Sequence, residues 1–378
     1  MARHISRRSV LAGTVTGALA LALPWRLNAG ATWRRYSDAI VIDGCGGPGN
    51  SATDTGTPLS AAQVEDVRLS GITCANITVG SVGSNPTDAA FVQAVNDIAY
   101  WESQIDLHPD VLARIRTVAD IDAAKKLGRT GLSYAFQDGV AFEEDLSRLE
   151  TFHRLGVRVI QPTYNRRNLL GDGCLEPANA GLSRTGVEAI QRMNALGILV
   201  DLSHCGRQTA ADAIKASSRP IVFSHTGCAA VADHPRNRTD AELRAVAEKG
   251  GVSGIYFMPY LNVGHQATAA DVVRHIEHAI DVAGEDHVSI GTDGGISAEV
   301  LDDAFRKHFA EVSRARREAG IAAPGETEDG YLFAADLNTP RRLETLAGLL
   351  AERGWSDARI EKLLGANLRR VFADAWGS

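Results

Sequence analysis

The feature that most constrains the fold is an alternation of short apolar segments with helical segments, which repeats eight times after Tyr36. Strands that alternate with helices form parallel sheets, and eight such units in roughly 250 residues are typical of an α/β protein of the (β/α)8, or TIM barrel, type. An open doubly wound sheet is the alternative, because a sequence does not show whether a sheet closes. The expected strands are residues 39–42, 72–79, 131–136, 157–162, 198–202, 220–223, 252–257 and 287–291.

The helices expected between these strands cover residues 88–105, 111–127, 142–155, 184–196, 209–216, 241–249 and 271–283. Further helical segments follow the last strand at 300–319, 341–353 and 357–373. No linker that could separate a domain precedes them, so we expect them to pack on the barrel as extra C-terminal helices. Residues 32–378 are therefore expected to form one barrel domain.

Residues 1–31 predict an export signal. The pair Arg7-Arg8 and Ser-Val-Leu precede an apolar run that ends at Leu23, and small residues follow at 29–31. The paired arginines favour twin-arginine export, and the run is shorter than the ~20 residues that span a bilayer. We expect cleavage after Ala31, a periplasmic or secreted protein, and no stable membrane insertion afterwards.

The charge of the chain argues against two classes of partner. The 378 residues include 39 basic and 46 acidic ones, a net charge of −7. Loss of residues 1–31 would remove four arginines and no acid, which leaves 35 basic residues and a charge of −11. Such a chain is unsuited to nucleic acid or an anionic membrane. Five cysteines without tight spacing do not describe a disulfide framework either.

Two histidines follow neighbouring expected strands in the same way. Segments 198–202 and 220–223 each lead into Ser-His, which gives His204 and His225. The C-terminal ends of parallel strands meet at one edge of a sheet, so both imidazoles should face one pocket. Imidazole is the commonest metal ligand, so the pair predicts a metal or catalytic site. Each could alternatively be a hydrogen-bonded structural residue of a strand end.

Other polar residues follow the remaining strands, where the working residues of a barrel lie. An aspartate there, Asp293, suits metal-assisted hydrolysis, in which imidazoles hold the ion and a carboxylate takes a proton from its bound water. Asp293 could instead cap a turn. The other candidates at strand ends are Cys45, Gln137, Asp138, Tyr164 and Asn165.

The most distinctive segments of the chain are GLSRTGVEAIQRMNALGILVDLSH, VFSHTGCAAVADHPRNRTD, HIEHAIDVAGEDHVSIGTDGG and RIEKLLGANLRRVF. Together they resemble the membrane (renal) dipeptidase family of metallopeptidases, over about residues 40–372. The resemblance implies a metal-dependent barrel of the amidohydrolase type that cleaves dipeptides at a two-zinc centre. It also implies that His204 and His225 bind one zinc and that Asp293 is the catalytic carboxylate. Arg236 would then hold the substrate's terminal carboxylate, a role that suits a guanidinium.

The other half of the expected site departs from the family pattern. The family's first strand ends in Asp-Gly-His-Asn-Asp, whose His and last Asp bind the other zinc, but here the segment reads DGCGG, with Cys45 at the place of the His. Gln137 replaces the bridging glutamate, and a neutral amide bridges two cations poorly. Tyr164, which precedes Asn165, replaces a histidine that helps to hold the tetrahedral intermediate. A phenol can donate a hydrogen bond but lacks an imidazolium's charge.

Three interpretations follow. The first is a hydrolase with one zinc ion rather than two, held by His204 and His225 with Cys45 as a third ligand. Gln137 is a weaker candidate ligand. This enzyme would act on a dipeptide or another small carboxylated amide, with Asn165 among the residues that contact the substrate. The second is a binding protein that has lost catalysis. The third is a metal-independent enzyme that uses Asp293, a histidine and Tyr164. A homodimer is one option for its assembly.

Overall fold

The computed structural model describes residues 32–377 apart from 52, 54–55 and 84–86. The expected export signal, residues 1–31, lies outside the described residues. In the part of the chain that is described, no helix is long and apolar enough to cross a bilayer.

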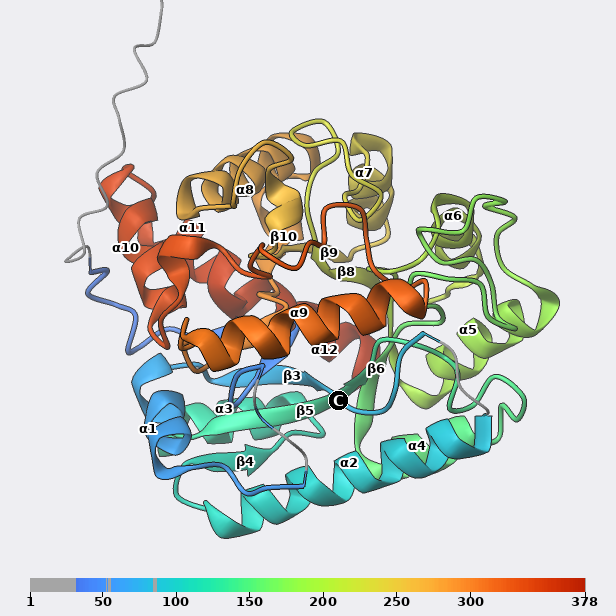
Figure 1. The fold of residues 1–378 in the computed structure, drawn as a ribbon, viewed down its shortest axis with the longest axis horizontal. Helices are drawn as coiled ribbons and strands as arrows, with labels where there is room; N and C mark the ends of the chain where they lie inside the picture. Colours follow the sequence, from blue (N-terminus) through green and yellow to red (C-terminus); the bar gives the residue numbers. More distant parts are fainter. Residues whose placement is uncertain (1–31, 52, 54–55, 84–86, 378) are drawn as a thin grey trace, which may run out of the picture.

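Eight parallel strands form the centre of the molecule (Figure 1). Neighbouring strands follow one another in chain order without a reversal, as expected for a barrel and not for a doubly wound sheet. In order around the sheet they are β1 Ile42–Asp43, β3 Cys74–Thr78, β5 Thr130–Phe136, β6 Val157–Ile160, β7 Leu199–Asp201, β8 Ile221–Thr226, β9 Val252–Ile255 and β10 Val288–Ile290.

The ring between β10 and β1 is nearly closed. Gly44 N donates to Ile290 O (2.9 Å), and two short parallel strands, β2 Gly46–Gly47 and β11 Gly294–Gly295, continue the contact beyond the strand ends. The space there is tight, since a Cβ on Gly44 would lie 2.9 Å from the carbonyl oxygen of Ser224. The structure therefore confirms the predicted (β/α)8 barrel, with the strands at the expected places.

One expected helix is wrong in its first part. Residues 111–127 were predicted as one helix, but Leu112–Arg114 form β4, which pairs with β5, and α3 covers only Val118–Leu127. Thr117 explains the boundary, because its side chain caps α3 in a capping box with Asp120. The short apolar segment before the cap forms a strand because it pairs with β5, a tertiary contact that overrides its local preference.

One helix was not expected, at Ala61–Ser70, and the helix expected at 142–155 begins only at Arg148; the other helices lie near the expected positions. Between the strands lie α1 Ala61–Ser70, α2 Thr87–Leu107, α4 Arg148–Leu155, α5 Arg184–Leu196, α6 Arg207–Ala216, α7 Asp240–Glu248 and α8 Ala269–Ala283. After β10 come α9 Asp303–Glu318, α10 Arg342–Glu352, α11 Asp357–Glu361 and α12 Asn367–Trp376, with a π-helical turn at Lys362–Ala366.

The two ends of the barrel differ in chemistry. Leu368, Val371 and Phe372 of α12 pack in one buried cluster with residues near the starts of the strands, among them Cys74, Leu199, Val222 and Val252. This helix closes the N-terminal end of the barrel. Polar side chains gather at the opposite, C-terminal end, where barrel sites are built.

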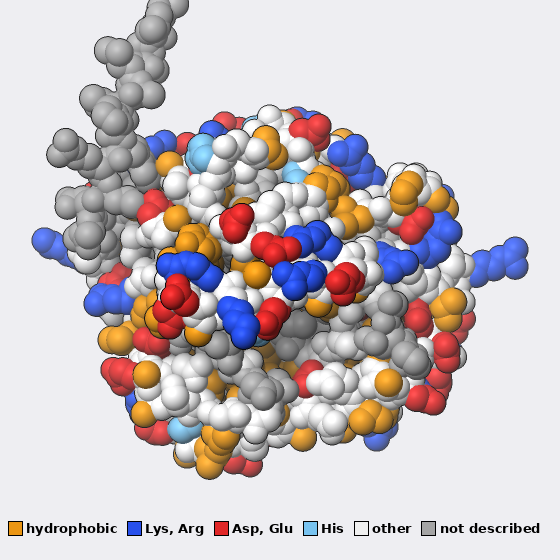
Figure 2. Space-filling model, in the orientation of Figure 1, with side chains coloured by type: hydrophobic (Ala, Val, Ile, Leu, Met, Phe, Trp, Pro, Cys, Tyr) orange, Lys and Arg blue, Asp and Glu red, His pale blue; other side chains and the backbone are white. Residues whose placement is uncertain are grey.

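Helix α9 crosses the face turned to the reader in Figure 1, and basic and acidic side chains are mixed along it in Figure 2. Its C-terminal end approaches the turn after β6, where Arg166 Nη1 donates to Ala319 O (2.9 Å). Asn165 Nδ2 donates to Ile321 O (2.8 Å) just beyond the helix. The helix therefore forms one wall of the barrel mouth.

Candidate active site

One buried carboxylate holds both Ser-His turns in position. Asp201, the last residue of β7, accepts hydrogen bonds at Oδ1 from Ser203 Oγ (2.6 Å) and from the backbone N–H groups of Ser203 and Ser224 (3.0 Å each). Its Oδ2 accepts from Ser224 Oγ. These bonds fix the ends of neighbouring strands relative to each other and so bring His204 and His225 together.

The Nε2 atoms of His204 and His225 lie 3.0 Å apart. His204 Nδ1 donates to Asn165 Oδ1 (2.6 Å), and His225 Nδ1 donates to Ser224 Oγ (2.8 Å), whose own proton goes to Asp201. Each neutral ring therefore carries a lone pair on Nε2. Facing lone pairs repel, and a nearby cation reduces the repulsion; in this structure the Arg236 guanidinium donates to His204 Nε2 (3.0 Å), a place that a metal ion would take over. Two nitrogen ligands of tetrahedral zinc are roughly 3.4 Å apart, close to what is observed.

A second group of metal-ligand atoms adjoins this pair. Cys45, His225 and Asp293 each offer one ligand atom within 4.8 Å of the other two, whereas His204 lies outside this trio. Cys45 Sγ is 3.7 Å from Asp293 Oδ1 and accepts from Gln137 Nε2 at 3.5 Å. Sulfur, imidazole and carboxylate form a donor set that zinc accepts. The trio of Cys45, His225 and Asp293 therefore fits one zinc ion, and His225 also belongs to the histidine pair.

Gln137 presents its nitrogen, not its oxygen, to this centre. Nε2 donates to Thr78 Oγ1 (2.8 Å) as well as to Cys45 Sγ. The expected weak ligand is thus a hydrogen-bond donor to the candidate thiol ligand. Asp138 does not reach the centre, because its carboxylate accepts from Gly83 N and Asn168 Nδ2 (2.9 Å each).

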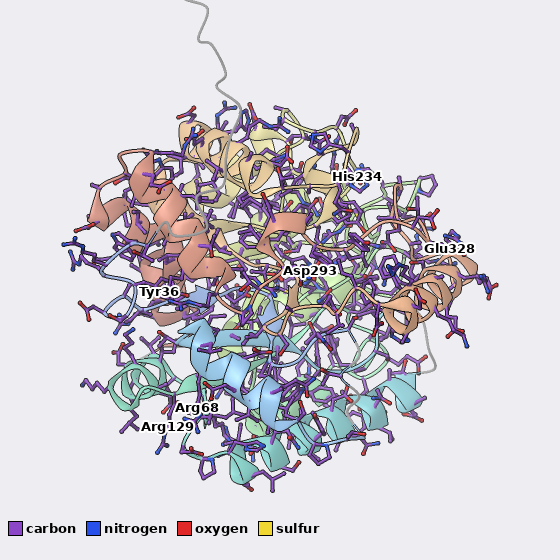
Figure 3. The ribbon with its side chains drawn as sticks, turned by 60° about the vertical axis from the view of Figure 1, so that its left-hand side comes forward. Tyr36, Arg68, Arg129, His234, Asp293 and Glu328 are labelled. Carbon is purple, nitrogen blue, oxygen red and sulfur yellow. The ribbon has the colours of Figure 1, made fainter. Side chains whose placement is uncertain are left out.

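Asp293 stands in an unusual backbone conformation, with φ of +57°. Its N–H donates to Cys45 O (2.7 Å), which ties the turn after β10 to the turn after β1. Burial raises the pKa of its carboxyl to about 6, although Arg236 and Arg316 lower it. Figure 3 places Asp293 near the centre of the view. A left-handed aspartate at a strand end fits a functional carboxylate better than an ordinary turn cap.

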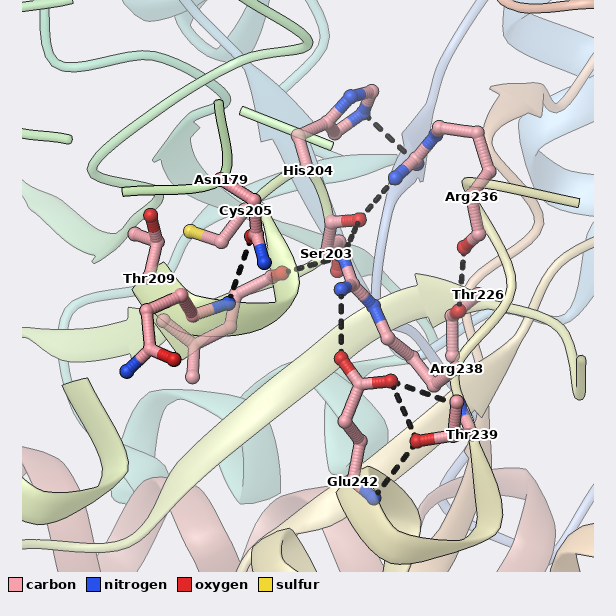
Figure 4. Close-up of polar contacts among 12 residues, drawn as sticks. Asn179, Ser203, His204, Cys205, Thr209, Thr226, Arg236, Arg238, Thr239 and Glu242 are labelled. Carbon is pink, nitrogen blue, oxygen red and sulfur yellow. Dashed lines mark hydrogen bonds and ion pairs between the residues drawn. The ribbon is translucent and has the colours of Figure 1, made fainter. Parts of the chain in front are cut away.

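Arg236 is a buried cation that pairs with no carboxylate of the described residues (Figure 4). Its Nη1 donates to Ser203 O, and its Nη2 donates to His204 Nε2 at 3.0 Å. The neighbouring Arg238 differs, because it pairs with Glu242 Oε1 (3.1 Å). A buried charge normally has a partner, so Arg236 points to an anionic group on a ligand. Burial and Arg236 also lower the pKa values of His204 and His225 far below the usual range, which keeps both rings neutral.

Tyr164 and Arg316 form a second buried group beside the histidines. The ring of Tyr164 stacks on His204, with centroids 4.0 Å apart, and its hydroxyl accepts from Arg316 Nη2 (3.2 Å). Glu326 fixes the guanidinium through Nε (2.8 Å) and Nη2 (3.0 Å), and itself accepts from Tyr260 Oη (2.7 Å). Burial raises the pKa of Tyr164 while Arg316 lowers it, so the group remains a phenol near neutral pH.

The contacts of Asn165 do not match the expectation that it binds substrate. Its Oδ1 accepts from His204 Nδ1 and Cys174 Sγ, and its Nδ2 donates to Ile321 O. Asn165 therefore orients His204. Sequence reasoning missed Arg316 and Glu326, because the first lies in an arginine-rich helix and the second in a loop with no motif.

The barrel, with imidazole and carboxylate groups at its strand ends, has the features typical of one class of protein, the metal-dependent hydrolases. A comparison with known protein families narrows this class to one family. The pattern described as membrane dipeptidase, peptidase family M19, matches residues 50–316, and the chain belongs to this family. The expectations of family and fold are confirmed, and the expected class, a dipeptidase-type hydrolase, is confirmed at the level of the family.

Individual relatives agree with this assignment. Dipeptidase verJ of Clonostachys rogersoniana is 29% identical over 270 residues, which are 71% of this chain and 61% of that protein. The chain thus spans about three fifths of that relative. An amidohydrolase structure from Pseudomonas aeruginosa is 33% identical, with a TM-score of 0.77 over 91% of this chain and 98% of that one. A metallopeptidase from Rhodobacter sphaeroides, liganded with a phosphinate mimic of L-Ala-D-Ala, shares the fold at 20% identity, with a TM-score of 0.71 over 90% and 100% of the two chains.

Proposed function

We propose that the protein hydrolyses a dipeptide, or another small amide with a free carboxylate, at a centre with one zinc ion. One observation supports the proposal most strongly. The buried Arg236 has no carboxylate partner among the described residues, and its Nη2 lies 3.0 Å from His204 Nε2, which in turn faces His225 Nε2. An anion-binding group and a cation-binding group lie side by side there. That combination suits a substrate that has a carboxylate close to the bond to be broken.

His204 and His225 would hold the zinc, and Cys45 would be the third protein ligand once the ion draws the three ligand atoms together, because they do not all lie within 4.8 Å of one another here. When bound, the ion supplies Lewis acidity and lowers the pKa of water. Burial and the nearby Asp293 raise the pKa of the Cys45 thiol well above its usual range, so the thiol stays protonated unless a cation is close. The ligand set would be two imidazoles and one sulfur, with a fourth position open for water or substrate.

Three residues of this chain would then bind the substrate, transfer the proton and stabilise the developing charge. Arg236 binds the carboxylate of the substrate and so orients the scissile amide. Asp293 accepts a proton at a carboxylate oxygen from the attacking water and later delivers it to the leaving amine. Tyr164 donates a hydrogen bond from its hydroxyl to the carbonyl oxygen, where negative charge develops. The hydroxyl is free to do so because, among the described residues, it accepts from Arg316 but donates to no acceptor.

The test is hydrolysis of a dipeptide panel by zinc-loaded protein, with Asp293→Asn as the inactive variant. We expect wild-type activity that falls at least about 100-fold in the variant and is abolished by a chelator. Activity that survives complete metal removal would instead favour the metal-independent alternative with Asp293 and Tyr164. Substrate binding without any turnover would favour the binding protein.

Export is part of the proposal. The features that support it are the Arg7-Arg8 pair and the apolar run that follows. Replacement of both arginines by lysine should retain the protein in the cytoplasm, as measured by fractionation of expressing cells. Unchanged export of that variant would contradict the twin-arginine route.

A further inference from the structure

A cavity of about 290 Å³ opens on the side of Asp293 that faces α9. Asp293, Gly294 and Gly295 form its inner end, so it adjoins the carboxylate to which we assign the proton transfer. Its walls come from α9, from the loop that follows it, and from Asn50, Ser51 and Glu299. They are largely apolar, and their apolar members are Phe305, Phe309, Val312, Leu332 and Phe333. We call this cavity the α9 pocket.

The chemistry of the α9 pocket suits an uncharged, apolar group. Neither lysine nor arginine is among its lining residues. Two acidic residues, Asp293 and Glu299, and one histidine, His308, line it. Glu299 is already engaged, because Ser51 donates to it from both N and Oγ at 2.8 Å. Phe305 and Phe309 stack with centroids 5.7 Å apart. An aromatic or aliphatic side chain placed there would remove apolar surface from water.

The position of Arg236 decides which part of a substrate reaches the pocket. Arg236 contacts Ser203 and His204, and neither these residues nor Arg236 itself lines the α9 pocket. The carboxylate end of the substrate therefore lies elsewhere in the mouth. Asp293 lines the pocket and lies at the scissile bond in the proposed mechanism, while the carboxylate end of the substrate is held by Arg236, so the group that enters the pocket belongs to the acyl side of that bond.

We propose that the α9 pocket is a specificity subsite for a bulky apolar side chain on the N-terminal, acyl-side residue of the substrate. This inference rests on the proposed function and names the substrate class more closely. It also assigns a role to α9, whose inner face carries Phe309 into the mouth while its outer face is charged.

The test compares Phe-Gly, Ala-Gly and Gly-Phe as substrates of zinc-loaded protein. We expect kcat/KM for Phe-Gly to exceed that for Ala-Gly by about 10- to 100-fold. V312W, which fills the pocket, should lower kcat/KM for Phe-Gly by about tenfold or more. The same variant should change kcat/KM for Gly-Phe by less than about twofold, because the ring of that substrate lies on the carboxylate side. The matched control is E311W, at an exposed neighbouring position of α9 that does not line the pocket.

A binding measurement separates this proposal from the proposed function. Phosphinate dipeptide mimics with a benzyl or a methyl group on the acyl side should raise the melting temperature differently, the benzyl compound more, and V312W should remove the difference. If no dipeptide is hydrolysed but this preference is found, the proposed function fails and the subsite stands. If dipeptides are hydrolysed but V312W affects Phe-Gly and Gly-Phe equally, or neither, the subsite is overturned. Equal stabilisation by both mimics would also overturn it.

Discussion

Arg316 Nη2 donates a hydrogen bond to the hydroxyl of Tyr164 at 3.2 Å, and this contact joins α9 to the turn after β6. The guanidinium places a positive charge beside a phenol, at the position where the resemblance to the dipeptidase family implies a histidine. A phenol that accepts from a cation is a better hydrogen-bond donor, so Arg316 supplies through Tyr164 part of the charge that the substitution removes.

We expect Y164F and R316M to lower kcat by about 10- to 100-fold with little change in KM, because a donor that acts on developing charge is used mainly in the transition state. R316K should recover part of the loss. The control is R317M, since Arg317 pairs with Glu328 and does not touch Tyr164. A rise in KM without a fall in kcat, or an equal fall in kcat in R317M, would mean that the role of Arg316 is merely structural.

Arg236 gives a prediction about the substrate. R236K keeps a positive charge but removes the bidentate fork, so KM for a dipeptide should rise by about tenfold or more. The same substitution should have little effect on the corresponding dipeptide amide, which has no carboxylate to bind. Steady-state kinetics on the two substrates measure this difference. An equal loss on both would contradict the assigned role.

Cys45 gives a spectroscopic prediction. Cobalt(II) in place of zinc should produce a sulfur-to-metal charge-transfer band, because we assign a thiolate ligand. C45S should lose the band, and C74S should keep it, since Cys74 lies in the buried cluster at the other end of the barrel. A band that persists in C45S would show that the sulfur ligand is wrongly assigned.

Stability should depend on pH through a histidine remote from the site. The buried His275 accepts from Cys228 N at Nδ1 and donates from Nε2 to Leu261 O (2.9 Å each), so only its neutral form fits. Burial lowers its pKa from 6.5 to about 4. The unfolded chain therefore binds the proton first, and the free energy of unfolding should fall as pH drops from 6.5 to about 4, by about 3 kcal/mol.

The measurement is urea unfolding at pH 7 and pH 4, with H275Q as the reference, because glutamine offers an acceptor and a donor but does not titrate in this range. The wild type should lose more stability than H275Q between the two values. Equal losses would mean that His275 does not contribute to the pH dependence.

The sequence predicted the barrel because each strand is a short apolar run with its own turn residues, and the parallel order follows from the crossover helices. It also predicted that His204 and His225 converge, since equivalent positions of consecutive strands share one edge. The misassigned segment at Leu112–Arg114 becomes a strand only through its pairing with β5, a contact distant in sequence. No local pattern marks such a segment.

The same limit applies to the contacts of the site residues. Asn165 follows a strand end like the other candidates, but only its three-dimensional contacts reveal that it orients His204. Arg316 reaches Tyr164 from a helix 152 residues further along the chain. The sequence showed that Gln137 differs from the glutamate of the family pattern. It could not show that the amide nitrogen faces the site, because that orientation depends on the hydrogen bond to Thr78.

The central claim is a centre with one metal ion, and the most direct test is the zinc content of purified protein after saturation with zinc and removal of the excess. We expect about one zinc ion per chain in the wild type and almost none in H204A and H225A, with a weaker affinity for zinc in C45S. Two zinc ions per chain, or none under saturating conditions, would contradict it.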